Sequence, residues 1–205
     1  MQNPTARQYC LATIFAAFAA FIPVAVAQSL LDNYSPVSLA DLQDPPENDW
    51  LMWRRTANHW GYSPLAQIDK TNVGSLRLAW AWTMEPGRQE TTPLVHDGVM
   101  FLPQACDFIE AVDATDGSPL WEYRRPVVDH IATLACANRN ATLYKDQLII
   151  ATMDAYLVSL NARTGEVTWE RQVGDWTVGQ HYSGGPQVFD GKIITGMSGC
   201  YYINT

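Results

Sequence analysis

The feature that most constrains the fold of this chain is an internal repeat with a period of 48 residues. The segment Ala111–Trp121 (AVDATDGSPLW) aligns without a gap with Ser159–Trp169 (SLNARTGEVTW), and the two tryptophans lie 169 − 121 = 48 positions apart. Each copy reads as a strand, a tight turn and a second strand that carries the tryptophan. Asp or Asn opens each turn, and Gly117 or Gly165 supplies the positive φ that the reversal requires. The repeated unit is therefore predicted to be β-structure.

A further strand is predicted before each repeated unit. Short apolar runs follow an Asp-Gly or Asp-Gln pair at 99–102, 148–151 and 192–195, and the last of these opens a third copy. Such runs, bounded by Gly and Asp, indicate strands that alternate with hairpin turns. Four short antiparallel strands in about 45 residues describe one blade of a β-propeller. We therefore predict an all-β chain made of four-stranded antiparallel blades in an incomplete ring.

Three tryptophans occupy equivalent positions in this scheme. An earlier unit at 71–80 ends in Trp80, which lies 121 − 80 = 41 positions before Trp121. A large flat ring gives neighbouring blades a rigid apolar contact. We therefore expect the three indole rings to pack between blades, and we interpret 71–80 as a strand belonging to the last blade of the ring.

The N-terminus predicts export. Residues 10–27 are almost wholly apolar and end in Ala25-Val26-Ala27, the small-x-small pattern that signal peptidases cleave. An uncleaved membrane anchor is the alternative, since about 18 apolar residues is near the lower limit for a span. Pro23 breaks the apolar run and favours cleavage. We expect a signal peptide at 1–27, an N-terminal extension at 28–48, a partial propeller at 49–205 and a periplasmic location.

Composition excludes several other classes of protein. The chain is 47% hydrophobic, which is enough for a folded core rather than a disordered chain. Its net charge of −8 argues against general nucleic-acid binding, because an acidic surface repels phosphate. Cys106, Cys136 and Cys200 remain after cleavage, and this odd number leaves one unpaired or paired outside the chain. Neither the cysteines nor the four scattered histidines have the spacing of a metal site.

The repeat carries a family resemblance. The pattern A-x-D-A-x-x-G-x-x-x-W at 111–121 resembles the WD-like tryptophan-docking repeat of quinoprotein dehydrogenases. These are exported eight-bladed propeller enzymes that use pyrroloquinoline quinone (PQQ). The segments 49–80 and 90–100 are similar to the start of their mature chains and to their first full blade. The tract 121–126, together with Ser198-Gly199-Cys200, resembles the alcohol- and sugar-oxidising branch rather than the methanol branch.

The resemblance implies that part of a PQQ pocket is present. Glu90 occupies the place of an acidic residue that hydrogen-bonds PQQ, and Arg139 that of an arginine that pairs with a PQQ carboxylate. Thr152 matches a threonine that bonds the cofactor. Ser198 and Gly199 match a small pair whose backbone lies close to the ring. A planar guanidinium suits a tricarboxylated quinone because bidentate, charge-assisted bonds fix its orientation. Taken singly, these residues are also compatible with a solvated loop acid, a surface cation and an ordinary strand threonine.

The chain departs from the family pattern at two cysteines and at one metal ligand. The methanol branch has two adjacent cysteines in a strained disulfide over the cofactor, whereas Cys136 has alanines on both sides. Tyr201 stands where the family commonly has a calcium-binding glutamate, and tyrosine is a poor calcium ligand. We therefore expect calcium in the complete family enzyme but no metal ligand in this chain. Cys200 resembles a cysteine whose disulfide partner lies further along in related chains.

The resemblance also limits the function expected of these 205 residues. A complete enzyme would oxidise a small alcohol or sugar and pass electrons to a cytochrome or quinone acceptor, and association with the inner membrane is left open. The family's aspartate base comes from later blades, so no catalytic residue is assigned here, and we expect the chain alone to be inactive. Two alternatives are a non-enzymatic propeller scaffold of the outer-membrane assembly type and a truncated product, unstable because its sheet edges are open.

Overall fold

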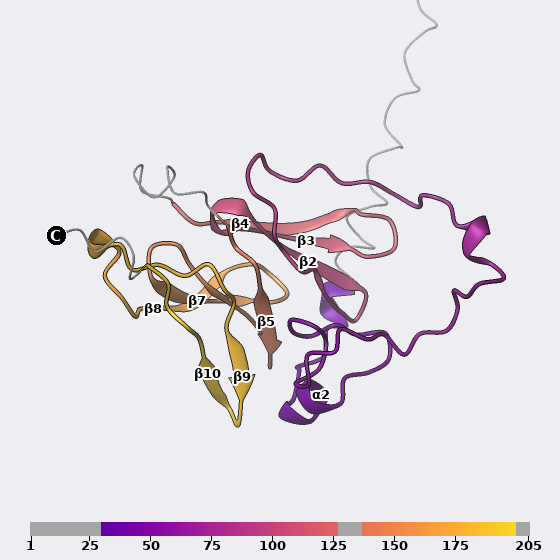
Figure 1. Ribbon diagram of the computed structural model, residues 1–205, viewed down its shortest axis with the longest axis horizontal. Coiled ribbons are helices and arrows are strands. Elements are labelled where there is room, and N and C mark those ends of the chain that lie inside the picture. Colours follow the sequence, from indigo (N-terminus) through magenta and orange to yellow (C-terminus); the bar gives the residue numbers. More distant parts are fainter. Residues whose placement is uncertain (1–29, 127–136, 200–205) are drawn as a thin grey trace, which may run out of the picture.

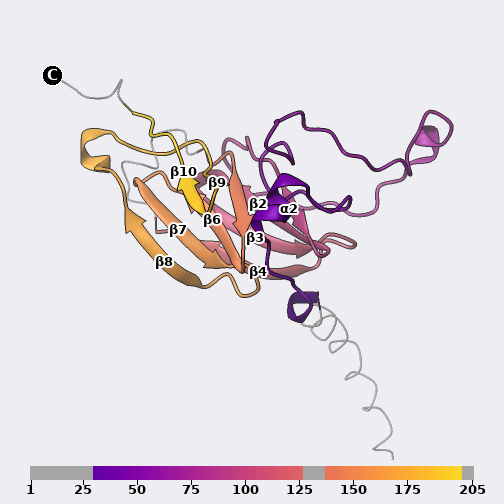
Figure 2. The same cartoon turned by 90° about the horizontal axis from the view of Figure 1, so that it is seen from below.

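The computed structural model describes residues 30–126 and 137–199, which form three antiparallel sheets. The all-β fold predicted from the repeat is confirmed. The two larger sheets lie side by side, and a two-stranded hairpin follows them (Figure 1; Figure 2). The predicted signal peptide, Cys136, Cys200 and Tyr201 lie outside the described residues. Within the described ranges, no helix has both the length and the apolar character needed to cross a membrane.

Each sheet is a meander in which every strand pairs with the next one in the sequence. The first sheet contains β1 (Leu94–His96), β2 (Val99–Gln104), β3 (Phe108–Asp113) and β4 (Pro119–Arg124). The second contains β5 (Ala141–Tyr144), β6 (Gln147–Ala151), β7 (Tyr156–Asn161) and β8 (Val167–Gln172). The hairpin contains β9 (Gln187–Phe189) and β10 (Lys192–Ile194). The short helices are α2 (Leu39–Gln43) and the 3-10 turns η1 (Val73–Ser75), η2 (Ala105–Asp107) and η3 (Trp176–Val178).

The repeat governs details of the pairing. The register shifts between Ala111 and Val112 in the first sheet, and between Ser159 and Leu160 at the equivalent place in the second. The first strands lie next to one another, with β1 beside β5 and β5 beside β9. Each four-stranded sheet therefore corresponds to one propeller blade, with its first strand next to those of its neighbours.

Tryptophan docking joins the first blade to the second. Gly165 has φ +73°, and a Cβ added there would lie 2.6 Å from the ring of Trp121. Trp121 Nε1 donates to the carbonyl oxygen of Ala162 at 3.0 Å, in the same turn. Trp80 makes the same pair of contacts with the turn at Gly117. The turn glycines therefore serve two purposes: they permit the reversal, and they leave room for an indole ring from the preceding unit.

The segment that leads to the first sheet differs from its prediction. The unit 71–80, interpreted as a strand, forms none in the described structure: 73–75 are the 3-10 turn η1 and 76–93 contain no strand, although Trp80 docks as expected. A strand needs a hydrogen-bonded neighbour, and the described residues provide none along 77–91. Side chains hold the segment instead: Trp82 Nε1 donates to Glu110 at 2.9 Å, and Gln104 Oε1 accepts from the amide of Glu85 at 2.7 Å.

The N-terminal segment packs across the first strands of both blades. Val37 forms a two-way backbone bridge with Lys145, at the turn after β5, and Trp50 forms one with Val95 in β1. Tyr34 is buried in the same apolar core as Phe101 and contacts it edge-on. Residues before position 49 are therefore part of the core that the blades share, while the proposed domain boundaries remain predictions.

Candidate functional site

The predicted cofactor residues lie at one end of the sheets. Glu90 and Arg139 precede β1 and β5, the first strands of their blades, whereas Thr152 and Ser198 follow β6 and β10, the second strands. Because the first two strands of each sheet are antiparallel, the start of one lies beside the end of the other. The topology alone therefore brings residues that are far apart in the sequence to a common edge.

A direct ion pair crosses from one blade to the next at this edge. Arg139 Nη2 lies 2.5 Å from Glu90 Oε2, and Arg139 Nη1 donates to the carbonyl oxygen of Ser183 at 3.1 Å. The side chains of Arg139 and Glu90 are 40% and 31% exposed, so solvent screens the pair and its contribution to stability is small. The guanidinium is thus held between three segments of the chain while its charge remains accessible to an anion.

Ser198 and Gly199 lie against the segment before β9. Ser198 exchanges two backbone hydrogen bonds with His181, and its hydroxyl oxygen lies 3.5 Å from that of Ser183. Gly199 is buried with φ +106°, and a Cβ there would lie only 1.9 Å from the carbonyl oxygen of Gly179. Only glycine allows this close approach of two backbone segments, while the predicted approach of Ser198 and Gly199 to a cofactor ring stays a prediction.

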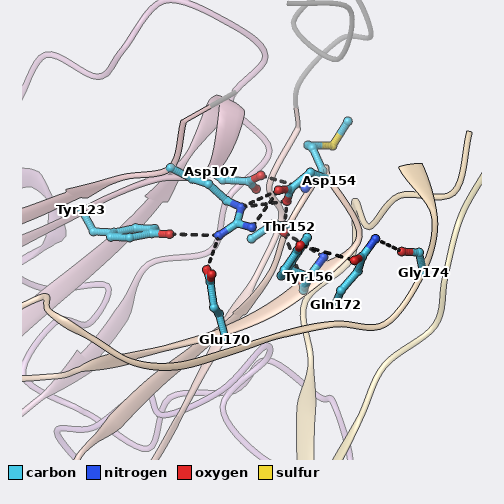
Figure 3. A network of polar contacts seen from close by, with 10 residues as sticks. Asp107, Tyr123, Thr152, Asp154, Tyr156, Glu170, Gln172 and Gly174 are labelled. Atoms are coloured by element: carbon cyan, nitrogen blue, oxygen red, sulfur yellow. Dashed lines mark hydrogen bonds and ion pairs between the residues drawn. The ribbon is translucent and has the colours of Figure 1, made fainter. Parts of the chain in front are cut away.

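Thr152 is completely buried, and its hydroxyl is already engaged. The oxygen donates to Asp154 at 2.5 Å and accepts from the amide of Tyr156 at 3.1 Å. Its carbonyl oxygen accepts from the amide of Tyr182 at 3.2 Å, which connects it to the segment that carries Ser183. The backbone of Thr152 therefore connects it to the other predicted cofactor residues at this edge. Its side chain points into the boundary between the blades (Figure 3). Whether Thr152 also contacts a cofactor stays a prediction.

Two polar atoms next to the ion pair have no hydrogen-bond partner among the described residues. Thr91 Oγ1 and Asn140 Oδ1 are both buried, and they adjoin Glu90 and Arg139 in the sequence. A buried polar atom without a partner is costly unless a water, ion or ligand completes it. The residues present thus offer a cation in Arg139 and a hydroxyl donor in Thr91, which fits an anionic cofactor.

A polar network that includes Thr152 joins the two blades (Figure 3). Arg125 donates to both carboxylate oxygens of Asp154 at 2.7–2.9 Å and to Glu170 at 3.0 Å. Its guanidinium also stacks over the ring of Tyr156, 4.5 Å from the ring centroid. Burial disfavours the charged guanidinium, but the hydrogen bonds with Asp154, Tyr123 and Glu170 outweigh it and raise the pKa of Arg125. Arg125 is therefore a permanent cation that links the first blade to the second.

Sequence reasoning did not identify the residues of this network. Asp107 and Asp154 stand outside the aligned repeat unit and belong to no motif, and Arg125 was noted only as part of the tract 121–126, without a role of its own. The only available signal was the position of each residue at a strand end on the edge where the cofactor residues were expected. In the described ranges, no group of three or more His, Cys, Asp or Glu side chains is arranged to hold a metal ion.

Successive four-stranded blades, joined by tryptophans that dock on turn glycines, define a β-propeller protein of the tryptophan-docking type. Residues 50–174 match the family of the glucose/ethanol/alcohol dehydrogenase β-propeller domain, which is named for PQQ. The chain belongs to this family of PQQ-dependent dehydrogenases.

Characterised relatives agree with this assignment. The chain is 35% identical over 197 residues to quinohemoprotein alcohol dehydrogenase ADH IIB of Pseudomonas putida, covering 94% of this chain and 27% of the relative. It is 34% identical to the dehydrogenase subunit of the alcohol dehydrogenase (quinone) of Gluconobacter oxydans, covering 91% of this chain and 26% of the relative. The solved structure of quinohemoprotein alcohol dehydrogenase ADHIIG from Pseudomonas putida superposes with a TM-score of 0.77 at 31% identity, covering 81% of this chain and 25% of that one. The chain thus spans about a quarter of the length of these relatives.

Proposed function

We propose that this chain contributes the first blades and part of the quinone pocket of a PQQ-dependent alcohol dehydrogenase. The observation that carries the proposal is the Glu90–Arg139 ion pair, which stands at the common edge with Ser183 and beside two unpartnered buried polar atoms. The similarity to quinohemoprotein and quinone alcohol dehydrogenases supports the same cofactor. Glu90, Arg139, Thr152, Ser198 and Gly199 are the residues that we assign to the pocket.

The side chains at this edge are suited to binding and orienting an acidic ring system. PQQ, when bound, supplies a quinone that takes up the two electrons of an oxidised alcohol. Arg139 would form a charge-assisted, two-pronged bond to a carboxylate, which fixes direction as well as position. Glu90 holds the guanidinium from one side, and the carbonyl oxygen of Ser183 holds it from another. Gly199, which lacks a side chain, lets the backbone approach closely.

The chain alone is not proposed to carry out the whole reaction. We assign no catalytic base and no metal ligand to it, and we propose that in a complete enzyme the blades that these residues do not cover supply them. In the complete enzyme, the substrate would be an alcohol or sugar hydroxyl, and the electrons would pass to a cytochrome or a quinone. We further propose that the protein acts in the periplasm, because residues 10–27 have the pattern of a cleaved export signal.

Titration with PQQ tests the pocket. We expect a saturable change in quinone absorbance on adding the chain, and we expect Arg139→Ala to abolish it. Arg171→Ala is the matched control, because Arg171 is an exposed cation on the outer strand β8 of the same blade. A chain that folds but gives no saturable change would contradict the proposal and favour the non-enzymatic scaffold. Dye-linked oxidation of ethanol or glucose by the isolated chain would contradict its predicted inactivity.

A further inference from the structure

Asp107 occupies the corner between β2 and β3, at the centre of the boundary between the blades (Figure 3). Its side chain is buried, and both Cys106 and Asp107 have φ of 58°. This left-handed conformation is uncommon for residues with a Cβ and persists where the surroundings hold it. Cys106 is disulfide-bonded, so the corner is also tied covalently.

The carboxylate of Asp107 binds two residues of the second blade. Oδ2 accepts from the backbone amide of Met153 at 2.7 Å, and Oδ1 accepts from Asn138 Nδ2 at 3.1 Å. Met153 follows Thr152, and Asn138 precedes Arg139. One carboxylate of the first blade thus holds the immediate neighbours of two residues that we assign to the cofactor pocket.

The buried carboxylate of Asp107 lowers the stability of the fold when it is ionised. No ion pair to Asp107 is found among the described residues. Arg125 faces it but is engaged by Asp154 and Glu170, and Asp154 and Tyr123 are the other titratable groups that face it. Burial raises the pKa of Asp107 to about 7, and the nearby charge of Asp154 adds to this rise. The hydrogen bonds that Asp107 accepts and the positive charge of Arg125 oppose it. A residue kept only for stability would not need a charge here.

We propose that Asp107 is a positioning residue for the cofactor pocket, holding the Asn138–Arg139 and Thr152–Met153 pairs in the arrangement that presents Arg139 to the quinone. This inference rests on the proposed function. A carboxylate suits the role because each of its oxygens accepts one of the two N–H groups. An asparagine has one acceptor oxygen, so its amide nitrogen would face one of the two N–H groups.

The test is Asp107→Asn, compared with Asp113→Asn. Asp113 is a buried carboxylate at the other end of β3, where it accepts from the amide and hydroxyl of Thr115. At pH 8 we expect Asp107→Asn to raise the melting temperature, because it removes a buried charge, and yet to weaken PQQ binding roughly three- to tenfold, the effect of one lost hydrogen bond. We expect Asp113→Asn to lower the melting temperature and to leave PQQ affinity unchanged. A purely structural role would move stability and affinity in the same direction.

The pH profile and the amide resonances supply the remaining measurements. Wild-type affinity should weaken as the pH falls through about 7, where Asp107 gains its proton, and Asp107→Asn should flatten that profile. Unchanged affinity in Asp107→Asn would overturn the inference. If the wild-type chain binds no PQQ, the proposed function fails, and NMR then decides the positioning role by itself. Asp107→Asn must shift the Asn138, Arg139 and Met153 resonances while Asp113→Asn leaves them in place; equal effects would overturn it.

Discussion

The first blade and the β9–β10 hairpin follow the same sequence pattern but differ in what covers them. In the first blade, Trp80 covers the turn at Gly117, and Trp121 docks on the second blade. In the hairpin, Val188 is buried, whereas Phe189 and Ile194 are 67% and 55% exposed. Both hairpin turns are built alike, with a positive φ at the Asp and at the Gly of Asp97-Gly98 and Asp190-Gly191. Local sequence therefore fixes the hairpin, while burial depends on the neighbouring blade.

The tryptophans show the same contrast within one repeat. Trp121 donates to a backbone carbonyl of the next blade, whereas Trp169, at the equivalent place, donates to Gln147 of its own blade at 3.3 Å. The long segment before the first blade also has large apolar side chains that no neighbouring blade covers. Trp60 and Leu78 are 78% and 83% exposed on a segment that extends away from the sheets (Figure 1; Figure 2). A mutation at a boundary between two packed blades should thus lower the free energy of unfolding more than a mutation at the equivalent place without such a boundary.

The largest difference is expected between Trp121→Ala and Trp169→Ala. Removing the docked ring of Trp121 leaves a cavity between two blades and should cost about 3 kcal/mol of unfolding free energy. Removing the ring of Trp169, whose Nε1 bonds within its own blade in the described residues, should cost about 1 kcal/mol. Urea unfolding followed by circular dichroism measures both. Equal losses would mean that the blade boundary contributes no more than the packing within a blade.

The second comparison concerns two adjacent arginines. Arg125→Met removes the buried partner of Asp154 and should cost about 3 kcal/mol, because an uncompensated carboxylate remains. Arg124→Met removes the same charge one residue earlier, where Arg124 pairs with Glu85 at the surface, and should cost less than about 1 kcal/mol. The same urea titration applies. A larger loss in Arg124→Met would show that the boundary network does not hold the blades together.

The third comparison uses two glycines, one in a turn of the second blade and one in the segment before β9. Gly165→Ala places a methyl group 2.6 Å from the Trp121 ring at a φ of +73°, and it should cost about 2 kcal/mol. Gly184→Ala meets nothing within 4 Å and lacks the positive φ, so its effect should be close to zero. Melting temperatures separate the two. A tolerated alanine at Gly165 would mean that the indole ring moves without loss, contrary to docking.

The fold could be predicted from the sequence because its determinants are local and repeated. Three features appear more than once: the turn glycines, the Asp-Gly pairs and the tryptophan spacing. Because they recur together, they indicate a repeated structural unit rather than a chance match. The edge that gathers Glu90 and Arg139 follows from the family motif and from antiparallel pairing. The absence of the strand expected at 71–80 was not predictable in this way, because a strand depends on a partner that the local sequence does not contain.

The buried polar contacts could not be predicted for a different reason. The fold brings together Asp107, Arg125 and Asp154, which are far apart in the chain. In its own segment, each has the sequence environment of a surface charge. The same holds for His96, one of the four scattered histidines without the spacing of a metal site. Its role depends on Ser35 and Asp49, both in the N-terminal segment. Such pairs have no periodic signal, since they occur once.

His96 gives the smallest expected effect, on the covered side of the first blade. Its Nδ1 lies 2.7 Å from Asp49 Oδ2, and its Nε2 lies 2.8 Å from the carbonyl oxygen of Ser35. Both partners are acceptors, so only the protonated ring can donate to both. Burial opposes the charge, but the hydrogen bonds to Asp49 and Ser35 and the nearby Asp97 outweigh it and raise the pKa of His96 above 6.5.

Because the folded-state pKa is raised, this stabilisation is complete below about pH 6.5 and is lost as the pH rises through the folded value. Wild type should exceed His96→Gln in unfolding free energy by about 1 kcal/mol at pH 6, and the difference should shrink at higher pH. Asp107 titrates in both proteins, so its contribution cancels in the difference. His59→Gln, which leaves the Asp49 contact intact, should track wild type at every pH. A difference that stays constant with pH would mean that His96 is neutral and that one of its two contacts is not a hydrogen bond.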